Sequence, residues 1–192
     1  MRLIVQSRTY QLSGEGNATN REDELNYSRS RPRPLEAVVL LDAISRVTGV
    51  DEKFMWEELA GGGSTTPGTR AMDLIPDVSP CRFLDVYGRS NRLTLPEQKN
   101  QPNLSRALHK MVGPTYTDKI GRKGGRVDRL LRSAASNRQA IEELYLAALG
   151  RLPTAREGTE LDGLIRRQPT RRGALEALTW ALISSREFTN NH

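Results

Sequence analysis

Few side chains in this sequence could carry out chemistry, and they lie far apart along the chain. There is one cysteine, Cys81, and there are two histidines, His109 and His192. A single cysteine excludes an intrachain disulfide and a multi-cysteine zinc site, and no cysteine or second histidine lies four residues from His109. His109 is more typical of a core-edge residue than of a ligand or base. We therefore predict no metal site and no haem or other cofactor in this chain.

The remaining candidates for catalysis are Asp42, Asp85 and Arg89. Asp42 stands beside Leu41 and Ile44 in an apolar helical pattern, so its carboxylate could be half-buried and act as an acid or base. An ion pair between Asp42 and an arginine at position 29, 31 or 33 is the simpler interpretation. We assign no catalytic residue and keep these three only as weak candidates.

A second group of candidates is cationic and could bind an anion: Lys119, Arg122, Lys123, Arg126 and Arg129. Glycines between them would let backbone N–H groups approach a negatively charged ligand. The segment lacks the Gly-x-x-x-x-Gly-Lys-Ser/Thr spacing of a nucleotide-binding loop. A solvated turn with a basic face explains it more simply.

The composition narrows the class of protein. Lys and Arg total 29 against 23 Asp and Glu, a net charge of +6, which many proteins without a nucleic-acid partner share. We do not expect nucleic acid to be the partner. The longest apolar run, residues 37–41, is too short to cross a bilayer, and the first residues turn polar too soon for a signal peptide.

The first half must position Asp42, Asp85 and Arg89. Residues 1–34 form a polar segment, and residues 35–60 are predicted to be helical, with Pro34 in the first helical turn and Gly49 as a C-cap. A short second helix is expected within residues 51–60. Residues 61–102 carry prolines and glycines throughout and are predicted to be irregular.

The last ninety residues show repeated helical patterns. Asn103 should cap a helix with an apolar stripe that ends before Gly113, and further helices are expected near Val127, from about Arg138 to Leu149, after Thr154 and around Leu178. Thr154 with Glu157 forms a capping box. The sequence thus predicts a mainly α fold in one domain, 1–192, with an antiparallel helical cluster over 103–192 and a long irregular middle segment.

Several blocks together resemble one family. They are residues 6–13, 40–44, 48–49, 67–71, Phe83-Leu84-Asp85-Val86-Tyr87-Gly88-Arg89, 102–104, 107–109, 143–149, Arg151-Leu152-Pro153-Thr154, Ser185-Arg186-Glu187-Phe188 and His192. The chain resembles the C-terminal domain of unknown function of large planctomycete and verrucomicrobial proteins. Many relatives carry Cys-Glu-Cys-Glu-Arg where this chain has Leu95-Pro96-Glu97-Gln98-Lys99, so no thiol chemistry carries over.

The resemblance implies an exported protein, periplasmic or extracellular, in which such a domain follows others, often a planctomycete cytochrome c domain or bacterial Ig-like domains. Any haem would lie in that upstream part. We expect a non-catalytic helical module whose partner is an upstream domain, and a chain that begins inside the family pattern. Exposed apolar side chains, among them Leu3, Val5, Phe83 and Tyr87, would then mark the missing contact. The alternatives are an active site shared with a polysaccharide-related enzyme, with polysaccharide as the ligand, or an anion- or nucleic-acid-binding module.

Overall fold

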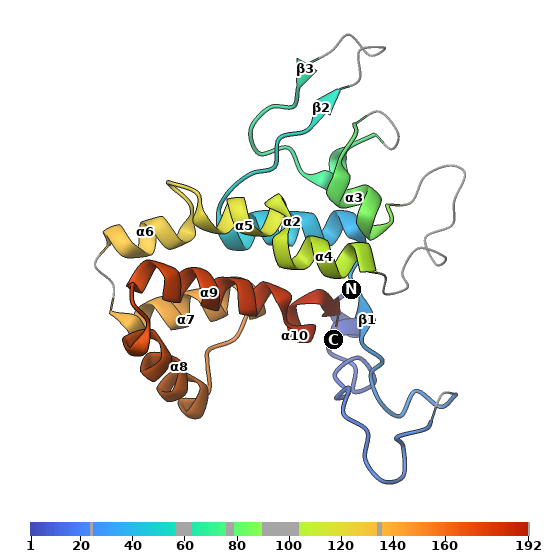
Figure 1. Cartoon of the computed structure of the whole chain (residues 1–192). Coiled ribbons are helices and arrows are strands. Elements are labelled where there is room, and N and C mark those ends of the chain that lie inside the picture. Colours follow the sequence, from blue (N-terminus) through green and yellow to red (C-terminus); the bar gives the residue numbers. More distant parts are fainter. Residues whose placement is uncertain (24, 57–62, 76–78, 90–103, 134–135, 192) are drawn as a thin grey trace.

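The computed structural model describes residues 1–23, 25–56, 63–75, 79–89, 104–133 and 136–191. Helices make up most of it, with short two-stranded pairings beside them, and this confirms the predicted mainly α fold (Figure 1). One apolar core joins the first half to the last, from Ala37 to Phe188. No helix of these described segments is long and apolar enough to cross a membrane.

The central helix of the fold is α2, Ala37–Thr48. Leu41 and Ile44 are completely buried on its inner face, and Gly49 takes the left-handed conformation at its end, with a φ of 65°. This conformation suits glycine because a Cβ would clash with the backbone there. The C-cap prediction is therefore confirmed, as is the helix itself apart from its first residues.

The start of α2 differs from the prediction. Pro34 does not open the helix but lies in β1, Arg33–Pro34, which pairs antiparallel with β4, Asn190–Asn191. Glu36 is the N-cap instead. The strand forms because a partner from the far end of the chain is present, and local sequence carries no sign of such a partner.

The C-terminal helices follow the predicted pattern. They are α6, Arg126–Arg132; α7, Asn137–Leu149; α8, Ala155–Arg167; α9, Arg171–Ser184; and α10, Arg186–Thr189. The predicted capping box of Thr154 and Glu157 is present at the start of α8, and Gly150 ends α7 in the left-handed conformation. Leu175 and Ile183 of α9 are completely buried. The predicted helical C-terminal half is confirmed.

Two helices precede this group, α4, Leu104–Val112, and α5, Pro114–Gly121. The expected cap of α4, Asn103, lies outside the described residues. Pro114 occupies the first turn of α5, where its missing N–H costs nothing. Lys119 therefore lies on a helix, whereas the sequence suggested a solvated turn for the whole segment 119–126.

The segments between α2 and α4 are more regular than predicted. Met55–Trp56 form strand β2, which pairs with β3, Gly63–Ser64. The helix expected within residues 51–60 is therefore wrong for residues 51–56, and residues 57–60 lie outside the described residues. Inside the tract predicted as irregular lie a 3₁₀ turn, η2, Ala71–Asp73, and a helix, α3, Arg82–Tyr87. A short helix becomes stable here because Phe83 and Leu84 reach the core.

The N-terminal segment begins with one helical turn, α1, Arg2–Val5, which buries none of its residues. Leu3 is 87% exposed and Val5 is 43% exposed, in line with the expected incomplete packing. Phe83 is instead buried at 2% exposure, so the expectation is wrong for that residue. In Figure 1 the two termini lie close together, beside β1 and α10.

Candidate functional site

The first candidate, Asp42, serves as a cap. Its Oδ1 atom accepts a hydrogen bond from the backbone N–H of Ala71 at 2.6 Å, and Oδ2 accepts one from Met72 at 3.2 Å. A carboxylate satisfies unpaired N–H groups at the start of a helical turn in this way. The expected ion pair with an arginine at position 29, 31 or 33 is thus replaced by backbone contacts that fasten η2 to α2.

The other two catalytic candidates, Asp85 and Arg89, are brought together one helical turn apart. Arg89 Nε lies 3.2 Å from Asp85 Oδ1, and Arg89 Nη1 donates to the carbonyl of Ser79 at 2.7 Å. The carboxylate of Asp85 is 56% exposed. These contacts indicate a role in ending α3, and catalysis by the three residues stays an untested prediction.

Among the anion-binding candidates, Lys119 is the most buried, at 5% exposure. Its Nζ atom donates to Val50 O at 2.9 Å and to Ser45 Oγ at 3.0 Å, and it forms an ion pair with Glu52 at 3.2 Å. Burial lowers the pKa of this amine, and Glu52 opposes that shift. Lys119 therefore fastens α5 to the end of α2.

Arg126 binds the same end of α2. Its Nε atom donates to Val47 O at 2.6 Å, Nη2 to Arg46 O at 3.3 Å, and Nη1 to Glu143 at 2.8 Å. A cation is favourable at the carbonyl end of a helix, where the helix dipole is negative. Arg129 lies against Gly49, so a Cβ at that glycine would meet its guanidinium at 2.3 Å.

Arg122 and Lys123 complete the predicted group. Within the described residues their side chains make no hydrogen bond or ion pair, so of the five cations these two stay available to solvent. Two exposed cations make a weak anion site, because the other cations of the segment are already directed at carbonyl oxygens. The anion-binding role stays a prediction.

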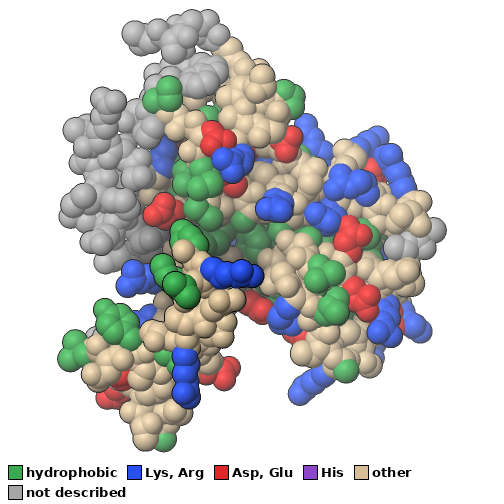
Figure 2. Space-filling model, turned by 180° about the vertical axis from the view of Figure 1, so that it is seen from behind, with side chains coloured by type: hydrophobic (Ala, Val, Ile, Leu, Met, Phe, Trp, Pro, Cys, Tyr) green, Lys and Arg blue, Asp and Glu red, His purple; other side chains and the backbone are tan. Residues whose placement is uncertain are grey.

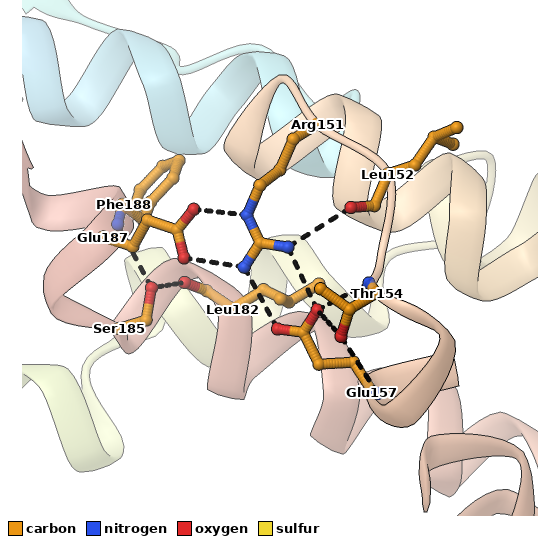
Figure 3. Close-up of polar contacts among 8 residues, drawn as sticks. All are labelled: Arg151, Leu152, Thr154, Glu157, Leu182, Ser185, Glu187 and Phe188. Carbon is orange, nitrogen blue, oxygen red and sulfur yellow. Dashed lines mark hydrogen bonds and ion pairs between the residues drawn. The ribbon is translucent and has the colours of Figure 1, made fainter. Parts of the chain in front are cut away.

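An arginine that the sequence reasoning did not single out forms a polar cluster with two glutamates (Figure 3). Arg151 donates to both oxygens of Glu187, at 2.6 and 3.0 Å, and to both oxygens of Glu157, at 3.0 and 3.1 Å. Bidentate pairs of this kind are among the stronger charge-assisted contacts. They hold the pKa of Glu157 down at about 2 and raise that of Arg151.

The Arg151 cluster ties together the end of α7, the start of α8 and α10. Its guanidinium also lies 5.3 Å from the centre of the Tyr145 ring. Each group is about one-third exposed, and every oxygen of both carboxylates already accepts a hydrogen bond. The cluster is therefore built to join helices, and two of the sequence blocks, residues 151–154 and 185–188, could have pointed to it.

His109 lies in an aromatic cluster, 7% exposed. Its ring centre is 5.5 Å from that of Phe83, 5.8 Å from Tyr87 and 6.2 Å from Tyr116. Nδ1 is buried and makes no hydrogen bond within the described residues, and burial lowers the pKa of the ring. No three His, Cys, Asp or Glu residues of the described chain lie close enough to hold a metal ion.

The helix that carries His109 is packed in an unexpected orientation. The polar side of α4 faces the protein: Arg106 donates to Tyr87 O at 2.7 Å and Val86 O at 3.3 Å, and Lys110 donates to Ser184 O. The apolar stripe faces outward, with these exposures: Leu104 74%, Leu108 52%, Met111 65% and Val112 72%. This orientation is the reverse of the usual one, in which an amphipathic helix turns its apolar stripe toward the core.

This outward stripe is the candidate functional surface. Apolar side chains scattered singly are normal on a protein surface, but four on one face of one nine-residue helix are not. Figure 2 shows the molecule from behind: Lys and Arg side chains lie over much of this face, and hydrophobic side chains gather near its middle.

Comparison with known proteins supports the resemblance in its coarse form. The model of the family described as protein of unknown function DUF1553, or PSD1, matches residues 1–165. The chain therefore belongs to this family. Neither the curated proteins nor the solved structures gave a match.

Proposed function

We propose that the chain is a non-catalytic helical module of a larger exported bacterial protein, and that α4 is the face on which an adjoining domain of that protein docks. The observation that carries the proposal is the outward apolar stripe of Leu104, Leu108, Met111 and Val112. The spacing of 104, 108 and 111 lies along one helix face, the pattern by which amphipathic helices recognise grooves or other helices.

The way α4 is attached supports docking. Arg106 and Lys110 hold its inner side to carbonyl groups at the ends of α3 and α9. Trp180 Nε1 also donates to Lys110 O at 3.0 Å. A partner would therefore meet a face that is already fixed in place, and a preformed surface loses less conformational entropy on binding.

The proposal of a non-catalytic role rests on how the polar groups are used. Both oxygens of Asp42 accept backbone hydrogen bonds, and the carboxylates around Arg151 are fully paired. Export, a periplasmic or extracellular location and any haem in an upstream domain come from the family resemblance. Fractionation of the cells that produce the protein would test export.

A binding experiment tests the docking face. The chain is titrated with the separately produced remainder of its parent polypeptide, and affinity is measured by calorimetry. Leu108→Glu should weaken binding at least ~10-fold, because a buried interface charge costs more than ~1.4 kcal/mol. The matched control is Leu164→Glu on α8, because Leu164 has the same 52% exposure.

Circular dichroism establishes that both variants keep their fold. Wild-type affinity in Leu108→Glu would reject α4 as the docking face. Equal losses in Leu108→Glu and Leu164→Glu would show that any added surface charge weakens binding, and would reject the proposal too.

A further inference from the structure

A cleft separate from α4 lies between the N-terminal segment and the β1–β4 pair. Its volume is about 490 Å³, within the range of small-ligand pockets. Its lining includes two tyrosines and three arginines: Tyr10, Tyr27, Arg29, Arg31 and Arg33. Ser7, Thr9, Ser30 and Asn191 line it as well.

One wall of the cleft is fixed by contacts between distant parts of the chain. The backbone N–H of Arg33 donates to Asn191 Oδ1 at 2.8 Å, and that of Leu35 donates to Thr189 O at 2.9 Å. Arg33 and Asn191 are thus held side by side as partners in the β1–β4 ladder. In the described part of the chain, the guanidinium of Arg33 has no hydrogen bond or ion pair.

The opposite wall exposes two aromatic rings. Tyr10 is 55% exposed, and its backbone N–H donates to Ser7 Oγ at 3.3 Å. Tyr27 is 79% exposed and has a φ of 51°, in the left-handed region. That conformation is strained for a non-glycine residue, and the exposed ring gains no packing in return.

The strained turn at Tyr27 is held by Asp23. Its Oδ1 atom accepts the N–H groups of Leu25 and Asn26, both at 3.0 Å, and Oδ2 accepts the hydroxyl of Ser28. The carboxylate of Asp23 is therefore occupied within its own loop. Arg29 donates to Asn20 O at 3.2 Å and to Arg21 O at 2.9 Å, and Arg31 donates to Asp23 O at 3.5 Å. Within the described residues Arg33 is therefore the arginine of the lining that can meet a ligand.

We infer that this cleft binds a small acidic saccharide, a sugar that carries carboxylate groups. An arginine guanidinium pairs with a carboxylate in a two-pronged geometry, which suits Arg33. Exposed tyrosine rings offer flat apolar faces for the C–H side of a sugar ring, and their hydroxyls bond sugar hydroxyls. The side chains of Ser30 and Asn191 can do the same.

A nucleic-acid strand fits this cleft less well. Binding a strand without base reading uses a basic groove along about 4–16 nucleotides, with an aromatic side chain for successive bases. The cations of the cleft belong to one five-residue stretch, from Arg29 to Arg33. The binding of an oligonucleotide is therefore an alternative outcome of the experiment.

The experiment titrates the full chain with a galacturonic acid trisaccharide, with maltotriose as the neutral ligand, and with a ten-residue oligothymidylate. We expect the acidic trisaccharide to bind and maltotriose to bind at least ~10-fold more weakly, because a charge-assisted hydrogen bond contributes about 1.5–3 kcal/mol. Arg33→Ala should weaken binding of the acidic trisaccharide by a similar factor. Arg156→Ala on α8 is the control, since that arginine is 87% exposed and distant in sequence.

Tyr27→Asn separates the ring from the turn, because asparagine tolerates the left-handed conformation. This variant should keep the fold. It should bind the acidic trisaccharide several-fold more weakly than the wild-type chain does. Equal binding of maltotriose, tighter binding of the oligothymidylate, equal losses in Arg156→Ala, or no binding at millimolar ligand would each overturn the inference. Leu108→Glu should leave saccharide binding unchanged, so the cleft and the α4 docking face can fail separately.

Discussion

Helices α4 and α9 both carry an apolar stripe, but they present it to opposite surroundings. On α9, Leu175 and Ile183 lie in the core, and Arg172 is exposed. On α4, Leu108 and Met111 face solvent, while Arg106, His109 and Lys110 face the protein. Amphipathic spacing predicts that a helix forms, and the partners available to each face decide which face is buried.

The reason lies at the ends of neighbouring helices. Carbonyl groups in a last helical turn lack intrahelical partners and carry partial negative charge. Arg126 binds such carbonyls at the end of α2, Arg106 at the end of α3 and Lys110 at the end of α9. In α4 these charge-assisted contacts take the inner face and leave the apolar face for another surface.

The largest difference should appear when a leucine of each helix is shortened. Leu175→Ala removes a completely buried side chain and should destabilise the fold by about 2–5 kcal/mol. Leu108→Ala, at a half-exposed position, should change stability by less than about 0.5 kcal/mol. Urea denaturation measures the free energy of unfolding of both variants. Similar losses would mean that the stripe of α4 is packed in solution.

Arg106 should carry the attachment of α4. Arg106→Ala leaves two carbonyls of α3 unpaired, which should lower the free energy of unfolding by about 1–3 kcal/mol. Arg106→Lys keeps the charge but not the fork, so it should recover only part of that stability. Chemical denaturation measures both. Full recovery in the lysine variant would show that charge alone holds the helix.

The pH dependence of stability should identify His109. Burial lowers its pKa below the ordinary value of 6.5, and Arg82 adds to this shift. The unfolded chain therefore binds more protons than the folded one, so stability should fall as the pH drops below 6.5. In His109→Phe the part of the pH dependence of stability that comes from this histidine should vanish. Denaturation at pH 7 and pH 5 measures the effect, and an unchanged slope would place the titration elsewhere.

The smallest effect should be a gain. Gly158 lies inside α8, and a Cβ there would meet nothing within 4 Å. Gly158→Ala should stabilise the helix by about 0.5–1 kcal/mol, because alanine loses less backbone entropy. Gly49→Ala is the contrast: its φ of 65° and the nearby Arg129 should make it destabilising. Thermal melting measures both changes: the melting temperature should rise in Gly158→Ala and fall in Gly49→Ala.

The features that sequence predicted best depend on a few adjacent residues. Gly49 and the pair Thr154 and Glu157 act within one helical turn, so their roles follow from local geometry. The mainly α fold follows in the same way. Helix α3 was missed because its stability comes from Phe83 and Leu84 reaching a core built by other segments.

The site residues were harder to predict because their partners are remote. Asp42 meets backbone groups 29 and 30 residues away, and Arg126 meets Val47 across 79 residues. Composition gave the correct inventory of charged side chains but no information on which carbonyl or carboxylate each would meet. The orientation of α4 could not be predicted for the same reason. The sequence shows that this helix has a polar and an apolar face, but not which face meets the rest of the protein.

The β1–β4 pair has a consequence for the order of folding. The contact between Arg33 and Asn191 spans 158 residues, so forming it early would close a very long loop before most other contacts existed. The neighbouring helices α7, α8 and α9 are joined by short connections and can assemble quickly. We therefore expect the helices to associate first and residues 33–34 to reach β4 late, so that a transient species with an ordered C-terminal half and an unattached N-terminal segment forms during folding.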